Sequence, residues 1–599
     1  MDTELNTERA LARARAFARD GKTAEAAALY RGILERFPDN RRAKEGLASL
    51  GPKGAGMARA AQAAAVRAML GRGQTGEALT RLQPLLLADP GNPDLNLLAG
   101  AGFAASGRHE VALKHYLLAL RLHPGLTAAA FGAGNMLYLM GQLEDAVAAF
   151  RQVVASEPQH DDALNNLGLA LHGLGRLEEA EAVFGQSVAA RPDSARSWFN
   201  LANCQRDRNL NDEAIRSYRK VLALDPTHAD AANNLGNVLR DLGDQAGAIA
   251  TYRDALRSRP DSAACWRNLA DLHRFGPGDP DIERMQALLA KATRDADRMQ
   301  LQFALGKAFD DLDDREAAFA AWVEANRLRK AQLGYDIALE RKLFATLKRY
   351  FSGSNPPAEL SPGPAPIFIL GMMRSGTTLV EQILSSHSEV QAAGEQEFMT
   401  RLCLPVMERA AKDDSLRSDV ATAAQVREGY RAGLRSLALE GPRVTDKMPL
   451  NFRWIGFVLT AFPEAKVIHL NRDPMAVGWS IFRHYFTAKG NGYAYDLADI
   501  GAYFRMQTDL MAFWHATFPG RILEVNYERL TEDQEGQTRA MLEYCGLGWE
   551  PACLDFHTRP GPVRTASSAQ VRQKMYQGSS DDWRRYGRFL DPLKAALEG

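Results

Sequence analysis

The stretch FILGMMRSGTTLVEQIL, residues 368–384, places an apolar run, a glycine-bounded loop and an amphipathic run in direct succession. Gly371 and Gly376 keep the G-x-x-x-x-G spacing of a phosphate-binding loop, and we predict that a helix begins at Thr377. Backbone N–H groups and the positive end of that helix would converge on an anion. The lysine that a triphosphate-binding loop carries beside its second glycine is missing, and no strand-end aspartate for magnesium stands out. The loop therefore predicts a terminal phosphate bound without a metal.

A predicted α/β domain surrounds this loop. Short apolar runs of strand length alternate with loops and helical stretches, which indicates a parallel sheet with helices on both faces. The runs are PIFILG at 366–371, RVTD at 443–446, AKVIHLNR at 465–472 and GRILEVNY at 520–527. Ligands of such sheets bind beyond the carboxyl ends of the strands. We therefore expect the functional residues directly after each run.

Two anion sites follow from this rule. The candidate ligands in the loop and its first helical turn are Arg374, Ser375, Gly376, Thr377 and Thr378. The second site combines Arg472, at the end of a predicted strand, with Ser480, two helical turns further on and on nearly the same side. An arginine fork and a hydroxyl separated in this way can hold a second phosphate.

Together the two sites resemble those of the sulfotransferase family. The resemblance covers residues 364 to about 590. It is closest to the protein-tyrosine sulfotransferases, because the cytosolic small-molecule enzymes carry lysine where this loop has Arg374. It implies 3′-phosphoadenosine 5′-phosphosulfate as the donor, with the 5′-phosphosulfate in the loop and the 3′-phosphate on Arg472 and Ser480. This donor has no triphosphate, so the resemblance explains why the loop lacks the lysine and the metal site that neutralise one.

The resemblance also implies a glutamate that acts as the base. An ungapped count from Arg374 places it at Glu395 in the segment AAGEQEF. Matching the glycine–glutamate pair with one inserted residue would shift the base to Gln396, which cannot usefully accept a proton. We therefore predict Glu395 as the base and keep Glu397 in reserve.

Two further family positions fall on Lys447 and Tyr527. Lys447 in TDKMP matches a lysine that contacts the transferring group, although Asp446 precedes it where the family has asparagine. Tyr527 in NYERL matches a tyrosine that lies near the nucleotide. The alternative for Tyr527 is a buried aromatic residue at the end of a strand.

The segment TASSAQVRQK near the carboxyl terminus resembles a family segment that contacts the donor. Ser567 takes the place of a serine that supports the transferring sulfate. The family's following lysine falls on Gln573, so Arg572 or Lys574 is expected to substitute for it.

A 34-residue repeat fills the first half of the chain. Its prolines are Pro90, Pro124, Pro158, Pro192, Pro226 and Pro260; its turn residues are Gly73, Gly107, Gly141, Gly175, Asn209 and Gly243; its alanines are Ala78, Ala112, Ala146, Ala180, Ala214 and Ala248. Asn209 suits a left-handed turn, because asparagine tolerates that conformation best after glycine. Helix, tight turn, helix and proline together resemble the tetratricopeptide repeat, which stacks into an α solenoid.

The predicted domains are a divergent first repeat with an insertion (1–58), tandem repeats (59–275), a degenerate helical repeat with a connector (276–351), a linker (352–363) and the sulfotransferase domain (364–599). The insertion includes the segment GPKGAGM, residues 51–57, which we expect to be flexible. Four asparagines stand 34 residues apart: Asn166, Asn200, Asn234 and Asn268. We predict that they form a ladder that holds a peptide backbone on the concave face. The alternative is that they are solvated or bond to neighbouring turns.

The composition excludes a global electrostatic role. Lysine plus arginine and aspartate plus glutamate both number 73, which predicts no collecting field for nucleic acid or an anionic membrane. No apolar leader or membrane span is visible, so we expect a soluble cytoplasmic protein. The five cysteines are scattered without metal-ligand spacing and are expected to be buried apolar residues.

The sequence thus predicts an α solenoid followed by an α/β domain with a P-loop-like site and the sulfotransferase fold, and the whole chain resembles bacterial tetratricopeptide-repeat sulfotransferases. The expected reaction moves a sulfuryl group to an acceptor hydroxyl on a protein or peptide presented by the repeats. Two alternatives stay open. One is a carbohydrate, lipid or small-molecule sulfotransferase whose repeats serve assembly, and the other is a repeat scaffold with an inactive domain.

Overall fold

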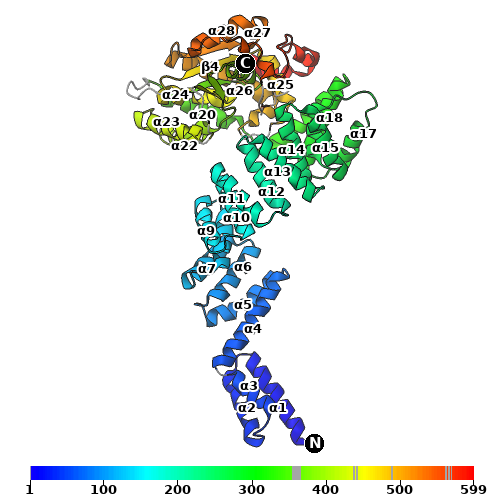
Figure 1. The fold of residues 1–599 in the computed structure, drawn as a ribbon, viewed down its shortest axis with the longest axis vertical. Coiled ribbons are helices and arrows are strands. Elements are labelled where there is room, and N and C mark those ends of the chain that lie inside the picture. The colour runs from blue at the N-terminus through cyan, green and yellow to red at the C-terminus, as the bar shows by residue number, and fades with distance from the viewer. Residues whose placement is uncertain are drawn as a thin grey trace. The chain divides into compact units, whose positions relative to one another are not determined.

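The computed structural model describes residues 2–50, 52–353, 366–435, 437, 439, 443–486, 490–559, 563, 565, 567 and 570–599. The chain forms two compact units, Met1–Asp207 and Arg208–Gly599, whose elements are labelled in Figure 1. Most of the predicted linker, residues 352–363, lies outside the described residues. Within the described part of the chain, no helix is both long enough and apolar enough to cross a membrane.

The first unit is built of helix pairs joined by tight turns. Its helices are α1 (Asp2–Arg19), α2 (Thr23–Arg36), α3 (Arg41–Ser49), α4 (Pro52–Gly71), α5 (Thr75–Ala88), α6 (Pro93–Ala105), α7 (His109–Leu122), α8 (Thr127–Leu139), α9 (Leu143–Ser156), α10 (Asp161–Gly173), α11 (Leu177–Ala190) and α12 (Ala195–Asp207). The repeat prediction is confirmed, because each turn glycine has a positive φ and each repeat alanine is fully buried. The insertion differs from the prediction, since residues 52–71 form one helix. Proline at the first helical position and the alanines that follow favour that helix.

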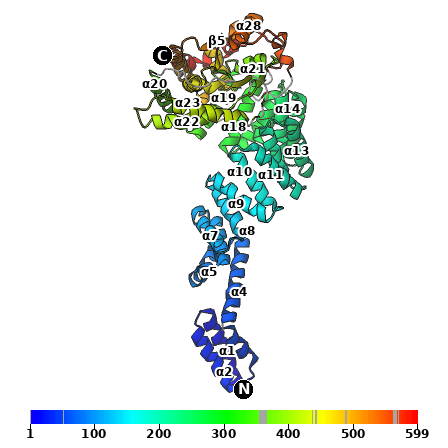
Figure 2. The ribbon, with the colours of Figure 1, turned by 60° about the vertical axis from the view of Figure 1, so that its left-hand side comes forward.

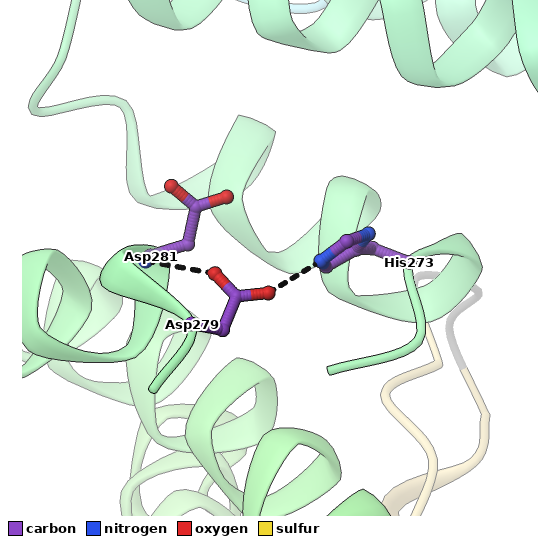
Figure 3. Close-up of side chains that lie close together, drawn as sticks. All are labelled: His273, Asp279 and Asp281. Carbon is purple, nitrogen blue, oxygen red and sulfur yellow. Dashed lines mark hydrogen bonds and ion pairs between the residues drawn. The ribbon is translucent and has the colours of Figure 1, made fainter. Parts of the chain in front are cut away.

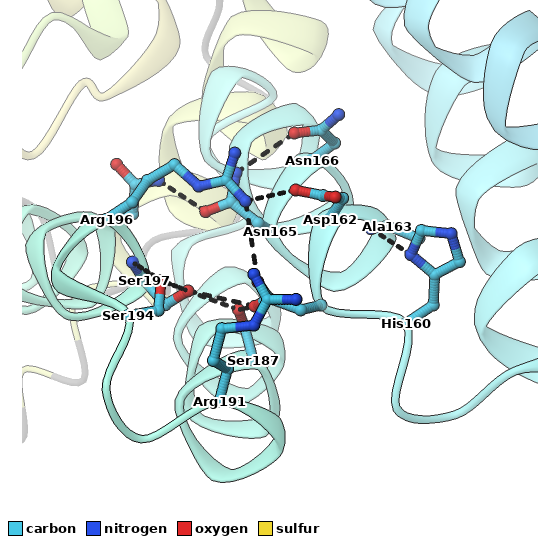
Figure 4. A network of polar contacts seen from close by, with 12 residues as sticks. His160, Asp162, Ala163, Asn165, Asn166, Ser187, Arg191, Ser194, Arg196 and Ser197 are labelled. Carbon is cyan, nitrogen blue, oxygen red and sulfur yellow. Dashed lines mark hydrogen bonds and ion pairs between the residues drawn. The ribbon is translucent and has the colours of Figure 1, made fainter.

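Polar side chains join neighbouring repeats of the first unit (Figure 4). Buried Asp161 accepts hydrogen bonds from Ser187 Oγ at 2.7 Å and from Ser197 Oγ at 3.2 Å. Arg191 lies 3.1 Å from the same carboxylate. A buried aspartate is tolerated here because hydroxyl and guanidinium groups from two further helical segments satisfy it.

The predicted asparagine ladder is engaged between repeats. Three of its amides donate to an asparagine of the preceding repeat: Asn166 Nδ2 to Asn135 Oδ1 at 2.8 Å, Asn200 Nδ2 to Asn165 Oδ1 at 2.7 Å, and Asn268 Nδ2 to Asn233 Oδ1 at 2.6 Å. Asn268 is only 1% exposed. It therefore offers no surface to a peptide, whereas Asn166 and Asn200 are partly exposed and remain candidates.

The second unit begins with the last repeats and continues into the α/β domain. Its first helices are α13 (Asn211–Leu224), α14 (Ala229–Leu242), α15 (Gln245–Ser258), α16 (Ala263–Leu272), α17 (Pro280–Lys291), α18 (Asp295–Asp311), α19 (Arg315–Leu333) and α20 (Ile337–Phe351). The left-handed conformation predicted for Asn209 is confirmed by its φ of 63°. The degenerate helical pair expected after the repeats corresponds to α18 and α19.

The α/β domain contains a parallel sheet in the order β2-β3-β1-β4-β5. The strands are β1 (Ile367–Gly371), β2 (Val390–Ala392), β3 (Arg443–Lys447), β4 (Lys466–Asn471) and β5 (Ile522–Asn526). The helices are α21 (Thr377–Ser385), α22 (Phe398–Ala410), α23 (Val420–Arg435), α24 (Ile455–Ala461), α25 (Pro474–Phe482), α26 (Leu497–Thr517), α27 (Tyr527–Glu532), α28 (Gln534–Cys545) and α29 (Asp591–Glu598). Short 3₁₀ helices are η1 (Pro449–Trp454), η2 (Gly492–Tyr495), η3 (Pro551–Cys553), η4 (Phe556–Thr558) and η5 (Asp582–Phe589). The predicted parallel α/β fold is confirmed.

Alternate residues of β1 enter two different cores. Phe368 and Leu370 pack with side chains of α20 and α22 to α26, whereas Ile367 and Ile369 pack with α21 and α28. Figures 1 and 2 both show α28 on the opposite side of the sheet from α22 and α23. Because β1 lies between β3 and β4, the carboxyl ends of these three strands meet at one edge.

Candidate active site

The phosphate-binding loop connects β1 to α21. Gly376 caps α21 with a φ of 107°, so the helix begins at Thr377 as predicted. Arg374 also adopts a positive φ, 66°, which is uncommon for a residue with a side chain. Among the described residues, the buried Ser375 Oγ has no hydrogen-bond partner. A helix amino terminus with an unpaired hydroxyl beneath it fits an anion such as a phosphate.

The Arg374 side chain joins the two predicted anion sites. Its Nε donates to Ser480 Oγ at 3.0 Å, and its two terminal nitrogens donate to Ser567 Oγ and Gln570 Oε1. Burial, together with the neighbouring cations Arg483 and Arg472, lowers the pKa of Arg374 to about 9. Three guanidinium groups brought together in this way favour a bound anion.

Arg472 lies between the loop and the carboxyl-terminal segment. It donates to the carbonyl oxygen of Arg374 at 3.0 Å, to that of Ser579 at 2.8 Å and to Ser580 Oγ at 3.1 Å. Its guanidinium carbon lies 4.3 Å from the centre of the Tyr527 ring. Ser579 and Ser580 could not be predicted from the sequence, because two serines outside any strand–loop–helix pattern give no signal of their own.

Tyr527 lies beside the loop and also packs, partly buried, against one of the two hydrophobic cores. A β-carbon at Gly376 would lie 2.5 Å from its ring, so glycine is required there for contact as well as for φ. The Tyr527 hydroxyl lies 2.9 Å from Ser579 Oγ. The ring thus fixes the start of α21 against β5.

Glu395 and Lys447 form an ion pair of 2.5 Å at the carboxyl end of β3. The Lys447 side chain is fully buried and that of Glu395 is 37% exposed. Gln396 instead donates to the carbonyl oxygen of Ala393 at 2.6 Å, and Glu397 lies 3.8 Å from Arg401. Of these three residues, Glu395 is the one that is paired with Lys447.

Two buried carboxyl groups lie near this ion pair. Glu381 Oε1 accepts hydrogen bonds from the N–H of Gly394 and from Thr445 Oγ1, both at 3.2 Å, and burial raises its pKa. Asp446 accepts from the Tyr430 hydroxyl at 2.8 Å, and burial raises the pKa of Asp446 to about 7. Asp446 is the residue that departs from the family's asparagine.

The raised pKa of Asp446 predicts a pH-dependent stability. Between about pH 4 and pH 7 the unfolded chain releases this proton while the folded chain keeps it, so the free energy of unfolding falls by up to about 1.4 kcal/mol per pH unit. Asp446→Asn should remove the contribution of Asp446 to this slope, because an amide keeps the bond from Tyr430 and does not titrate. Denaturant unfolding of both proteins from pH 4 to pH 8 measures the difference. An equal slope in the two proteins would contradict the assignment.

A single cavity of about 1660 Å³ collects most of the predicted site. The predicted residues that line it are Arg374, Gly376, Thr377, Thr378, Glu395, the reserve residue Glu397, Arg472, Ser480, Tyr527 and Ser567. Ser375 and Lys447 are buried and are not among the lining residues. Residues of α14, α16 and α18 line the same cavity: Arg240, Asp241, Arg267, Asp271, Lys307 and Asp310. Since pockets for small ligands have volumes of about 300–1,000 Å³, this cavity has room beyond a nucleotide.

The two expected substitutes for the family lysine are separated by the structure. Gln573 and Lys574 line the cavity. Arg572 instead donates to the carbonyl oxygen of Asp241 at 2.7 Å, in the last turn of α14. Lys574 is therefore the remaining candidate for the donor contact.

Among the described residues, one group could in principle hold a metal: His273, Asp279 and Asp281 (Figure 3). Their polar atoms are already engaged. Asp279 accepts from His273 at 2.7 Å and caps α17 by accepting from the N–H of Asp281. Asp281 pairs with Arg253 at 3.1 Å and Arg284 at 2.8 Å. Two arginines on one carboxylate favour a structural role.

Both parts of the chain match known families. Residues 366–551 match the model of the sulfotransferase family, and six segments between residues 11 and 274 match the tetratricopeptide repeat. The chain therefore combines tetratricopeptide repeats with a sulfotransferase-family domain.

Two curated relatives illustrate the similarity. An uncharacterized protein of Aquifex aeolicus (strain VF5) is 36% identical over 335 residues, which are 53% of this chain and 44% of that protein. The protein-tyrosine sulfotransferase of Drosophila melanogaster is 26% identical over 236 residues, 36% of this chain and 46% of that enzyme. The chain thus spans about half the length of these two relatives. A solved structure, YrrB, described as a TPR protein with an unusual peptide-binding site, covers 31% of this chain at 21% identity and a TM-score of 0.29.

Proposed function

We propose that this chain transfers a sulfuryl group from 3′-phosphoadenosine 5′-phosphosulfate to an acceptor hydroxyl on a protein or peptide. The observation that carries the proposal is the single cavity that contains the loop, the arginine cluster, Glu395 and a wall of repeat residues. The match to the sulfotransferase family supports the same reaction class. The ion pair between the buried Lys447 and Glu395 argues against an inactive scaffold, since a scaffold would need neither residue.

The loop and the arginine cluster fit the two anionic groups of this donor. Ser375, Thr377 and the N–H groups that begin α21 would hold the 5′-phosphosulfate. Arg472 and Ser480 would hold the 3′-phosphate, and Arg374 lies between the two sites. When bound, the donor supplies the sulfuryl group.

Glu395 would accept the proton of the acceptor hydroxyl, because its carboxylate is both partly exposed and part of the cavity wall. Lys447 is buried beside it and can offer its ammonium group to the oxygen that gains charge as the donor bond breaks. Ser567 lies against Arg374 and can support the transferring group from the opposite side. A new S–O bond would form at the acceptor oxygen while the S–O bond to the donor's 5′-phosphate breaks. Adenosine 3′,5′-bisphosphate would be the leaving group, and Glu395 would take the proton of the acceptor.

The acceptor would occupy the part of the cavity that the donor leaves unfilled. Residues of α14, α16 and α18 line the cavity that also contains Glu395. A peptide chain bound along these last repeats would therefore pass the proposed base, Glu395. The protein-tyrosine sulfotransferases among the relatives support a protein or peptide acceptor. A cytoplasmic location is proposed as well, and the five free, buried cysteines fit a reducing compartment.

Donor binding gives the first test of this function. Adenosine 3′,5′-bisphosphate should bind the full chain without magnesium, because the loop lacks the lysine of triphosphate enzymes and the arginines take up the charge. Isothermal calorimetry with and without a chelator measures this. Binding of ATP that requires magnesium, with none of the bisphosphate, would contradict the proposal.

A further inference from the structure

One segment of the donor site comes from the carboxyl-terminal part of the chain. We call it the strap and define it by its described residues Val563, Thr565, Ser567 and 570–580. The strap accepts hydrogen bonds from three parts of the predicted donor site. Arg374 of the loop donates to Ser567 and Gln570, and Thr378 of α21 donates to Thr565. Arg472, directly after β4, donates to Ser579 and Ser580. The strap therefore places five side chains or carbonyls on the groups expected to bind the donor.

The opposite side of the strap is attached to the repeats. The N–H of Val563 donates to the carbonyl oxygen of Asp241 at 2.9 Å, and Arg572 donates to the same oxygen at 2.7 Å. Asp241 is in the last turn of α14, which ends at Leu242. The final carbonyls of a helix have no partner within the helix and carry its negative partial charge. A guanidinium and a backbone N–H from the strap satisfy this one.

The repeat turn fits Arg572 closely. Gly243 ends α14 with a φ of 92°, and a β-carbon there would lie 2.8 Å from Arg572 Nε. The preceding repeat carries Asn209 at the matching turn with a φ of 63°, so asparagine is compatible with the turn itself. Glycine at 243 is needed for the contact with the strap rather than for the backbone alone.

We propose that the Asp241–Gly243 turn of the repeats is a positioning element for the donor site and that Arg572 is its positioning residue. The turn holds Arg572, Arg572 holds the strap, and the strap holds the side chains of Arg374 and Arg472. This inference rests on the proposed function. Arg572 would raise the affinity for the donor without contacting the donor itself. The repeats would then support the donor site, in addition to any role in binding the acceptor.

Two variants of the full chain test the inference by different routes. Arg572→Ala removes the contact from the strap. Gly243→Asn keeps a residue that tolerates the left-handed turn and adds a side chain where Arg572 lies. Gly141→Asn is the matched control, because it makes the same change at a repeat turn with nothing within 4 Å. All three variants should remain folded, which circular dichroism checks.

Both test variants should bind adenosine 3′,5′-bisphosphate on the order of tenfold more weakly than the wild type, the scale expected for a lost hydrogen bond from a charged group. The KM for the donor should rise by a similar factor, whereas kcat at saturating donor should stay within about twofold. Arg572→Lys should recover part of the affinity, since its ammonium group can still donate to the Asp241 carbonyl. Gly141→Asn should bind like the wild type.

Wild-type affinity in both Arg572→Ala and Gly243→Asn would overturn the inference and leave the proposed function intact. An equal loss in Gly141→Asn would also overturn it, because the effect would then come from the repeats as a whole. Failure of the wild type itself to bind the bisphosphate would remove the proposed function, and the inference with it.

Discussion

Replacing Glu395 with glutamine should reduce the rate of sulfuryl transfer by roughly 10²- to 10⁴-fold, the usual contribution of a positioned general base. Glutamine keeps nearly the same shape and loses the ability to take the acceptor proton. Donor affinity should barely change, because the loop, Arg374 and Arg472 are untouched. Single-turnover measurements at saturating donor separate the chemical step from binding.

Glu397→Gln is the matched control for this prediction. The Glu397 side chain lies toward Arg401 at 3.8 Å, whereas Glu395 is paired with Lys447. Full turnover in Glu395→Gln together with loss of activity in Glu397→Gln would transfer the role to the reserve residue. Unchanged rates in both would mean that this segment does not assist proton removal.

Replacing Arg472 with alanine should weaken nucleotides that carry a 3′-phosphate by about 1.5 to 3 kcal/mol, the scale of hydrogen bonds to a charged group. Arg472 also donates to the carbonyl oxygens of Arg374 and Ser579. A smaller loss is therefore expected for every nucleotide, since the loop and the strap lose a common partner. The contribution of Arg472 to binding the 3′-phosphate is therefore the loss of affinity for nucleotides with that phosphate minus the loss for nucleotides without it.

Calorimetry with adenosine 3′,5′-bisphosphate and adenosine 5′-monophosphate measures that difference. The second ligand lacks only the phosphate in question. Equal weakening of both ligands in Arg472→Ala would restrict Arg472 to supporting the loop and would leave the 3′-phosphate to other residues of the cluster.

The repeats and the loop could be predicted from the sequence because both rest on local rules. A left-handed turn favours glycine or asparagine, and one of these two residues recurs every 34 residues, with asparagine once, at Asn209. The glycine spacing of the loop fixes the start of α21 at Thr377. Strand β2 was missed because three residues, Val390–Ala392, are too few to show a period.

The contacts of the strap could not be predicted for a different reason. Arg572 and Asp241 are 331 residues apart, and the acceptor is a backbone carbonyl that no residue type marks. The sequence therefore left Arg572 as a candidate donor ligand beside Lys574. Ser579 and Ser580 were missed in the same way, since their role depends on where Arg472 lies in the folded domain.

Transfer of labelled sulfate from 3′-phosphoadenosine 5′-phosphosulfate into a bacterial lysate tests the central claim most directly, with Glu395→Gln as the blank. We expect the wild type to place label in the protein fraction and the variant to do so at least about a hundredfold more slowly. Label that enters glycans or small molecules would contradict the proposed acceptor. Absence of transfer to any fraction, under conditions in which the bisphosphate binds, would contradict the claim that the chain is a sulfotransferase.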